Sequence, residues 1–290
     1  MRKLFGLFFI LLGGLVLYGA LTNSVVGRWL TFGNAATDAV SLDGVERIEI
    51  RGAALDLRII PEQREDVSAA LRGGRKNVLS LNRNGDTLSI SVGKEWYQWF
   101  FSRHRYRLEV RIPWDYEHRL AIDVDAGDIR FHGPSVNRPM ALEELELELD
   151  AGEVYLSHLQ VERIQHRSWS GNVEAGYVTA EEADWHVTSG NLRLKNYSGS
   201  LGVEMVSGDV RIQMDDLSGP VDTAITSGDL RLDLPKDAGF TLDAKATSGE
   251  IHVDFPMRVV KKDLQSISGS HGSGKYPIRL RTTSGDIRIE

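Results

Sequence analysis

The sequence predicts an all-β protein, a parallel β-solenoid preceded by one N-terminal transmembrane helix. Three observations predict it: a four-residue glycine phrase that recurs about every 20 residues, alternation of polar and aliphatic residues after each copy, and an uncharged apolar segment at the start of the chain. A fixed period of this length is typical of repeat proteins, in which each unit buries its apolar face only by stacking on the next.

The first element is the apolar segment. No charged residue lies between Lys3 and Arg28, and the first 18 residues of this interval are almost wholly apolar. As a helix these 18 residues span about 27 Å, and the uncharged flank that follows extends the segment enough to cross a bilayer. We therefore expect residues 1–27 to form a transmembrane signal anchor and residues 28–40 to form a short tether.

The residues that flank this segment predict its orientation. Arg2 and Lys3 precede it, so the positive-inside rule leaves the N-terminus in the cytoplasm and the bulk of the chain outside. The alternative is a cleaved signal peptide, but Tyr18-Gly19-Ala20 is a poor cleavage site because its first position is bulky. The chain contains no cysteine, which excludes a lipoprotein anchor and a disulfide scaffold. The predicted localisation is the cell membrane, with one span and an extracytoplasmic domain.

Residues 41–125 are expected to form the N-terminal β region of the solenoid. Polar and apolar residues alternate in four segments of this region, at residues 45–50, 55–60, 88–92 and 108–112. The turn signal Asn84-Gly85-Asp86 lies between two apolar runs and is typical of a hairpin.

Residues 126–290 are expected to form the solenoid repeats. Each copy of the phrase has a small residue, glycine, a short polar or acidic residue and an aliphatic one; the eight corner glycines are Gly127, Gly152, Gly171, Gly190, Gly208, Gly228, Gly249 and Gly285. They lie 25, 19, 19, 18, 20, 21 and 36 residues apart, and a Gly/Ser-rich loop near residues 268–274 interrupts the last interval. A β-sandwich is the alternative, but a sandwich does not require the same turn phrase at every strand.

Alternation within the repeats predicts two or more short strands per coil, with Val210, Leu230 and Ile251 stacked in an inner column. The segment at residues 142–150 has the charge of a helix, but its leucines alternate strictly with glutamates, which predicts a strand. The last strand, residues 286–290, is expected at an exposed edge.

Two long segments resemble each other. Residues 108–129 align without gaps with residues 230–251, and Pro113 coincides with Pro235. In both copies a strand ends at this proline, which cannot donate a hydrogen bond to a sheet. The echo indicates an internal duplication in which a turn leads into the next glycine corner.

The chain resembles the bacterial "putative adhesin" family of β-solenoid domains, a family of unknown function. The resemblance covers roughly residues 45–290 and rests on residues 85–90, the strand at residues 108–113, the Ser-Gly-Asp corners and the closing residues 278–287. It implies a parallel solenoid that is often membrane-tethered, and some members resemble components of cell-envelope stress systems. The resemblance supplies no catalytic residues.

Two charged rows follow the corners. The first contains Asp128, Glu153, Asn172, Asn191, Asp209, Asp229, Glu250 and Asp286, and the second contains Arg130, Tyr155, Glu174, Arg193, Arg211, Arg231, His252 and Arg288. Such rows, stacked about 4.8 Å apart, fit a repetitive polymer such as a wall glycan or teichoic acid. The favoured alternative is an outer ladder that neutralises itself, because exposed ion pairs are common and weak. The glycine-glycine nonapeptide of calcium-binding β-rolls is missing, so we expect no metal.

An aromatic-basic segment is the second candidate site. It contains Trp96, Tyr97, Trp99, Phe100, Phe101, Arg103, Arg105 and Arg107. This composition suits contact with anionic lipid headgroups, sugar stacking or a partner protein. The alternative is a cap on the open end of the solenoid core. A further basic group, Arg258, Lys261 and Lys262, is expected in a solvated loop.

We expect no catalytic activity and no cofactor. The eight histidines are scattered without metal-ligand spacing, and no nucleophile elbow, P-loop or dinucleotide motif is present in the sequence. The net charge of -7 argues against a nucleic-acid partner. The sequence predicts a membrane-anchored, non-catalytic binding or scaffold module of the bacterial cell envelope, with a role in stress response. Its expected partners are the membrane and a cell-wall polymer or envelope protein. The alternatives are an adhesin that binds a polymer or host ligand through the charged ladder, and a glycan-acting enzyme.

Overall fold

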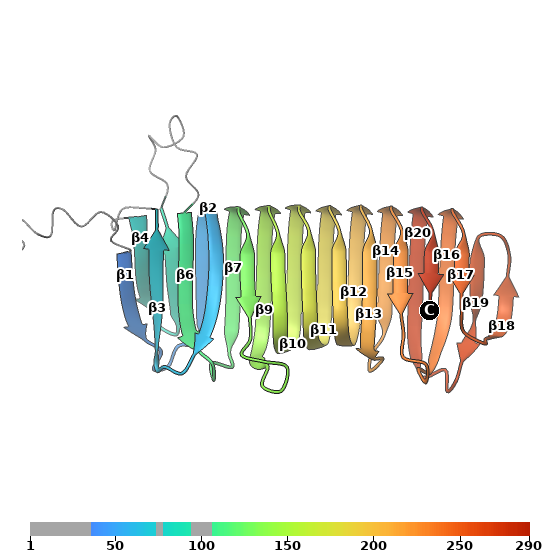
Figure 1. The fold of residues 1–290 in the computed structure, drawn as a ribbon, viewed down its shortest axis with the longest axis horizontal. Coiled ribbons are helices and arrows are strands. Elements are labelled where there is room, and N and C mark those ends of the chain that lie inside the picture. The colour runs from blue at the N-terminus through green and yellow to red at the C-terminus, as the bar shows by residue number, and fades with distance from the viewer. Residues whose placement is uncertain (1–35, 74–77, 94–105) are drawn as a thin grey trace, which may run out of the picture. The chain divides into compact units, whose positions relative to one another are not determined.

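The computed structural model describes residues 36–73, 78–93 and 106–290, which contain strands and no helix. All 21 strands belong to one hydrogen-bonded sheet that winds into a solenoid-like stack (Figure 1). The predicted all-β class is therefore confirmed for the described residues. The expected anchor at residues 1–27 lies outside them. The part of the chain that is described contains no helix that is long and apolar enough to span a membrane.

The strands of the N-terminal part begin at residue 36. They are β1 (Ala36–Ser41), β2 (Arg47–Glu62), β3 (Asp66–Arg72), β4 (Leu79–Asn84), β5 (Thr87–Val92), β6 (Tyr106–Pro113), β7 (Arg119–Ala126) and β8 (Ile129–His132).

The long central strands follow, and the last three of them each turn a corner of the stack. They are β9 (Met140–Ala151), β10 (Val154–Ser170), β11 (Val173–Ser189) and β12 (Leu192–Ser207). The remaining strands are β13 (Val210–Asp216), β14 (Val221–Ser227), β15 (Leu230–Asp233), β16 (Phe240–Ser248), β17 (Ile251–Val253), β18 (Arg258–Lys262), β19 (Ser266–His271), β20 (Tyr276–Ser284) and β21 (Ile287–Ile289).

Each coil contributes one strand segment before its glycine corner and one after it. In space, the segments before the corner run β2-β7-β9-β10-β11-β12-β14-β20-β16, and every pairing is parallel. The segments after the corner run β2-β8-β10-β11-β12-β13-β15-β21-β17, again in parallel. Equivalent residues of successive coils therefore stack directly on one another.

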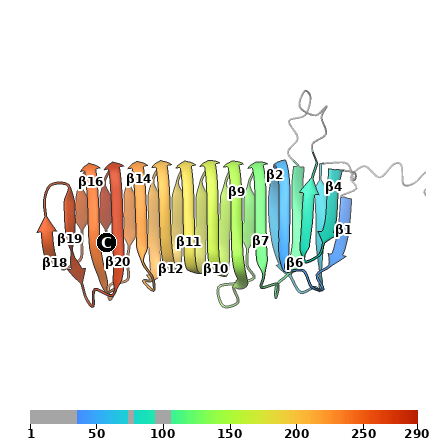
Figure 2. The ribbon, with the colours of Figure 1, turned by 180° about the vertical axis from the view of Figure 1, so that it is seen from behind.

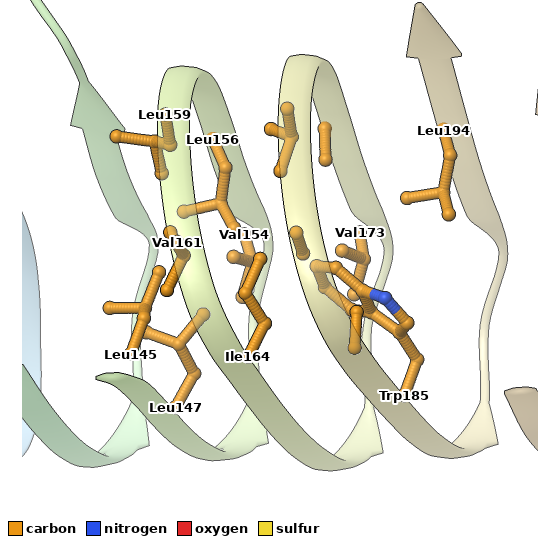
Figure 3. Packing of buried hydrophobic residues seen from close by; sticks show 14 of the residues in the cluster. Leu145, Leu147, Val154, Leu156, Leu159, Val161, Ile164, Val173, Trp185 and Leu194 are labelled. Atoms are coloured by element: carbon orange, nitrogen blue, oxygen red, sulfur yellow. The ribbon is translucent and has the colours of Figure 1, made fainter. Parts of the chain in front are cut away.

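The core is the space between these two rows of strands. Alternate residues point inward, so that Leu145 pairs in register with Ile164, and Ile164 with Ala183 (Figure 3). Trp185 and Tyr197 are among the largest fully buried side chains. The glutamate-rich segment is strand β9, as its alternation predicts, with its leucines buried.

The coils do not follow chain order at the C-terminal end. Strands β20 and β21 lie between the coil of β14 and β15 and the coil of β16 and β17. Ile287 therefore pairs with Leu230 on one side and with Ile251 on the other. The expected column of Val210, Leu230 and Ile251 is present, but Ile287 of the last coil is inserted between Leu230 and Ile251. The prediction of an exposed final strand is wrong, because β21 is hydrogen-bonded along both edges.

A coil is also placed out of chain order at the N-terminal end, where β2 lies between the coil of β5 and β6 and the coil of β7 and β8. The chain therefore passes over an inserted coil twice, from β6 to β7 and from β15 to β16. These two passages are the segments that echo each other in sequence. Each contains the same turn, in which Tyr116 N donates to Pro113 O (3.2 Å) and Ala238 N donates to Pro235 O (3.0 Å).

Antiparallel strands close both ends of the stack. At the N-terminal end β4 pairs with β5, and β3 joins β6 to β1. At the other end β19 pairs with β16, and β18 pairs with β19 as the outermost strand (Figures 1 and 2).

Candidate binding surfaces

The glycine corners stack into a continuous column. Gly208 has φ of 132°, in the region that favours glycine, and an added Cβ would lie 1.6 Å from the carbonyl oxygen of Gly190. Each corner backbone from Gly152 onward packs in the same way on a neighbouring corner, and Gly285 lies between Gly228 and Gly249. The column therefore requires glycine for close backbone approach, independently of any ligand.

The acidic row next to these glycines forms a hydrogen-bonded ladder. Oδ1 of Asp209 accepts the backbone N–H of Asp229 (3.2 Å), and Oδ1 of Asp229 accepts that of Asp286 (2.9 Å). Oδ1 of Asp286 then accepts the N–H of Glu250 (2.8 Å). Asparagines do the same in the central coils, where Asn172 accepts the N–H of Asn191 (3.0 Å). One oxygen of each of these side chains is thus committed to the backbone, which favours a structural role for the row.

Sequence reasoning missed one member of this ladder. Oδ1 of Asp56 accepts the N–H of Asp128 (3.3 Å), so the ladder begins in strand β2. No Ser-Gly phrase precedes Asp56; the only signal in the sequence is the alternation of Leu55, Asp56 and Leu57.

The second row becomes an arginine column near the C-terminal end. Arg193, Arg211, Arg231 and Arg288 occupy equivalent positions in four successive coils. Chain order would place His252 beside Arg231, but the inserted coil places Arg288 there. Arg211 lies 3.8 Å from Asp209, and Arg231 pairs with Asp233 (3.2 Å) and with Glu290. Within the described part of the chain, Arg193 and Arg288 make no ion pair.

A shallow groove of about 550 Å³ runs along this column. Its basic lining residues are Arg193, Lys195, Arg211, Arg231 and Arg288, and its acidic ones are Asp209, Asp229, Asp233, Glu250 and Asp286. The two signs are equally represented, so the groove carries no net charge when His252 is neutral. This balance favours the self-neutralising ladder over a site for a purely anionic polymer.

The aromatic-basic segment lies mostly outside the described residues, which include only Arg107 of the eight residues named above. Arg107 is exposed on β6 and pairs in register with Arg72 of β3. The strands to which the segment connects, β5 and β6, form the coil at the N-terminal end of the stack.

The smaller basic group does not lie in a loop. Arg258, Lys261 and Lys262 belong to the exposed edge strand β18, so the prediction of a solvated loop is wrong. Antiparallel pairing with β19 keeps this segment extended.

Chemistry in the described residues is limited. They contain no group of three or more His, Asp or Glu side chains that could hold a metal ion. Burial lowers the pKa of His132, which contacts the hydroxyl of Ser157 through Nδ1 (2.8 Å). His166 is fully buried in the core.

The described residues thus form an all-β domain of stacked coils. The model of the family described as Toastrack DUF4097 matches residues 45–290, and the chain belongs to this family. No curated protein matches the chain.

Solved structures share this fold. One, a "putative adhesin" from Bacteroides fragilis, is 14% identical, with a TM-score of 0.52 over 89% of this chain and 97% of that chain. Another, described in the same way, comes from Parabacteroides distasonis and is 11% identical, with a TM-score of 0.50 over 89% of this chain and 98% of that one. At this identity the likeness extends to the fold alone. The resemblance inferred from the sequence is confirmed.

Proposed function

We propose that the chain is a membrane-anchored, extracytoplasmic scaffold or binding module of the bacterial cell envelope that acts without catalysis. In this proposal residues 1–27 hold the protein in the cell membrane, and the aromatic-basic segment contacts the membrane surface or a partner. The resemblance to envelope proteins supports a role in the stress response, which survival of a deletion strain under membrane-damaging agents would test.

One observation carries this proposal. Strand β1 follows the expected anchor and contains the last five residues of the segment expected to be a tether. It pairs with β3, and β3 pairs with β6. Strands β5 and β6 flank residues 94–105 and lie at this same end of the stack (Figure 1). The chain thus enters the fold at the end from which the aromatic-basic segment leaves it. A segment that touches the membrane requires this arrangement.

Lipid binding by the aromatic-basic segment is tested by co-sedimentation of residues 28–290 with anionic liposomes. The variant Trp96→Ala/Trp99→Ala is expected to lose binding, because interfacial tryptophans anchor proteins at the headgroup level. Trp169→Ala is the matched control, since Trp169 is 71% exposed on the stack away from this end. Binding that survives the double substitution, or is lost equally in the control, would contradict the proposed lipid contact.

The anchor is tested separately with the full chain in bacterial membranes. Wild-type protein is expected to stay in the pellet after alkaline carbonate extraction, and Leu11→Arg/Leu12→Arg is expected to release it, because charge at the centre of a span is costly. Release of the wild type would contradict the anchor.

Adhesion is the second candidate; the groove as a whole carries no net charge, but two arginines of the column make no ion pair and favour it. Among the described residues Arg288 makes no ion pair, and Arg193 makes none although it lies in register with Glu174. A phosphodiester polymer would supply an anionic partner for both. If the column binds such a polymer, Arg193→Gln/Arg288→Gln will weaken retention on purified teichoic acid, whereas Arg163→Gln, in an exposed ion pair with Glu182 elsewhere on the stack, will not. Equal retention of all three proteins would exclude this site.

A further inference from the structure

The outermost hairpin at the C-terminal end is unusually apolar for a solvent-exposed element. Val259 and Val260 lie on β18, and Leu264 lies in the turn that connects β18 to β19. Val260 is 86% exposed and Leu264 is 95% exposed, the two highest values for large hydrophobic residues in the described part of the chain. Single exposed apolar residues are ordinary, but a cluster of three within six residues indicates an interaction surface.

The turn holds Leu264 in a fixed position. Asp263 accepts the backbone N–H of Gln265 (2.9 Å) and the hydroxyl of Ser266 (2.8 Å). Gln265 Nε2 then donates to the carbonyl oxygen of Thr247 on β16 (2.7 Å), which connects the turn to the coil of β16 and β17. Leu264 is therefore presented to solvent by a hydrogen-bonded turn.

The base of the hairpin is packed against the core. Phe255, just before β18, lies edge-on to the buried ring of Phe240, with 5.4 Å between ring centroids. The ring of His271, at the end of β19, packs on that of Phe255 with 4.9 Å between the ring centroids. Nδ1 of His271 also lies 3.0 Å from the carbonyl oxygen of Pro256. The apolar residues at the other end of the hairpin thus remain exposed although the hairpin itself is anchored.

The cations of this hairpin are only partly neutralised. Lys261 pairs with Asp263 (3.1 Å), and the neighbouring Asp254 is paired with His252 (2.6 Å). Arg258 and Lys262 make no ion pair with any described residue, so two cations flank the exposed valines. A second copy of the same hairpin would bring like charges together, which argues against self-association.

The edge of β18 is poorly suited to pairing with another strand. Its register with β19 shifts between Val259 and Lys261, which leaves Val260 as a bulge. Bulges and lysines are the features by which proteins prevent edge-to-edge strand pairing. The binding partner therefore has to accept apolar side chains and cations without adding a strand to the edge of β18. An anionic lipid surface meets these conditions.

We propose that the β18–β19 hairpin binds an anionic lipid surface, with Val260 and Leu264 entering the interface and Arg258 and Lys262 contacting lipid phosphates. This contact lies at the opposite end of the stack from β1 and β6 (Figure 2). Because the headgroup contacts are electrostatic, binding weakens as salt concentration rises.

The test uses the full chain reconstituted into nanodiscs of phosphatidylcholine, mixed with acceptor vesicles that contain phosphatidylcholine alone or with added phosphatidylglycerol. Co-flotation with the anionic acceptors is expected for the wild type. Arg258→Gln/Lys262→Gln is expected to bind about 30-fold more weakly, from the contribution of each cation near an anionic surface. Val260→Ser/Leu264→Ser is expected to lose most of its binding. Both variants should keep the wild-type melting temperature, because the altered side chains are exposed.

The matched control is Val136→Ser/Lys236→Gln, which removes an exposed valine and an exposed lysine elsewhere on the stack and should bind as the wild type does. The proposal is overturned if the wild type ignores anionic acceptors, binds uncharged ones equally, or binds independently of the hairpin substitutions. Loss only in Trp96→Ala/Trp99→Ala would assign the contact to the aromatic-basic segment.

Two other outcomes would also overturn the proposal. Nanodiscs that pair with one another through Val260 and Leu264 without acceptor vesicles would identify a second copy as the occupant. Capture of an acidic protein by the hairpin, with no lipid binding, would identify a protein partner. Failure of the chain to enter nanodiscs would contradict the N-terminal anchor. The chain would then be mixed with the acceptor vesicles directly, so that lipid binding by the hairpin is tested independently of the anchor.

Discussion

The imidazole of His166 lies against the indole of Trp185 in the core, with 5.4 Å between the ring centroids. The two residues are in register on adjacent strands β10 and β11, and both are fully buried. Neither ring makes a hydrogen bond to any described residue. A buried imidazole without a partner strongly disfavours its charged form, and burial accordingly lowers the pKa of His166 to about 3.

This pair predicts acid sensitivity. Below the ordinary histidine pKa of 6.5 the unfolded chain binds a proton at His166 that the folded chain excludes until its pKa of about 3. This contribution to stability therefore decreases as the pH is lowered from 6.5 towards 3. Well inside this range the decrease is about 1.4 kcal/mol per pH unit. His166→Leu should remove this part of the slope in urea unfolding from pH 7 to 4. His186→Gln, at an exposed site beside Glu204, is the control and should keep it; equal slopes for wild type and His166→Leu would contradict the assignment.

The glycine column predicts a position-specific cost for a single methyl group. Gly208→Ala should destabilise the fold by about 2 kcal/mol or more, because its Cβ would overlap the carbonyl of Gly190 at a φ that L-residues rarely adopt. Gly176→Ala is the matched control, since a Cβ there meets no atom within 4 Å. Thermal and denaturant unfolding of the two variants measures the difference. Similar stability for both would show that the corners tolerate a side chain.

The order of the last coils can be tested by disulfide cross-linking, because the chain has no cysteine of its own. Arg231 and Arg288 are direct neighbours in adjacent strands, whereas Arg231 and His252 are separated by β21. Arg231→Cys/Arg288→Cys should oxidise readily to a disulfide. Arg231→Cys/His252→Cys should not, because two strand spacings are roughly 10 Å and a disulfide needs Cα atoms within about 7 Å. A disulfide in Arg231→Cys/His252→Cys, and none in Arg231→Cys/Arg288→Cys, would show that the coils stack in the order of the chain.

The acidic ladder predicts rescue by asparagine. Asp229→Ala should lose about 1 kcal/mol, since the N–H of Asp286 then lacks its acceptor, whereas Asp229→Asn keeps an Oδ1 and should lose much less. Urea unfolding of both variants is the measurement. If the carboxylate charge mattered instead of the hydrogen bond, the two substitutions would be equally harmful.

Much of the local structure could be predicted from the sequence. The alternation of Leu145, Leu147 and Leu149 with glutamates outweighs a composition typical of helices, and the structure buries all three leucines on strand β9. The parts of the candidate sites that were misassigned, such as the basic group on β18, depend on pairing between segments. Local charge and turn signals contain no information about that pairing.

The sequence alone determined where strands begin, which faces are buried and where the chain turns, because these depend on period-two alternation and on glycine at crowded corners. Only the tertiary structure decided the order of the coils. The insertion of Ile287 between Leu230 and Ile251, which completes the arginine column, cannot be inferred from a repeat. Every coil presents nearly the same edge of backbone groups and the same inner aliphatic residues. Neighbours are therefore interchangeable locally, and connection lengths and end caps select one order.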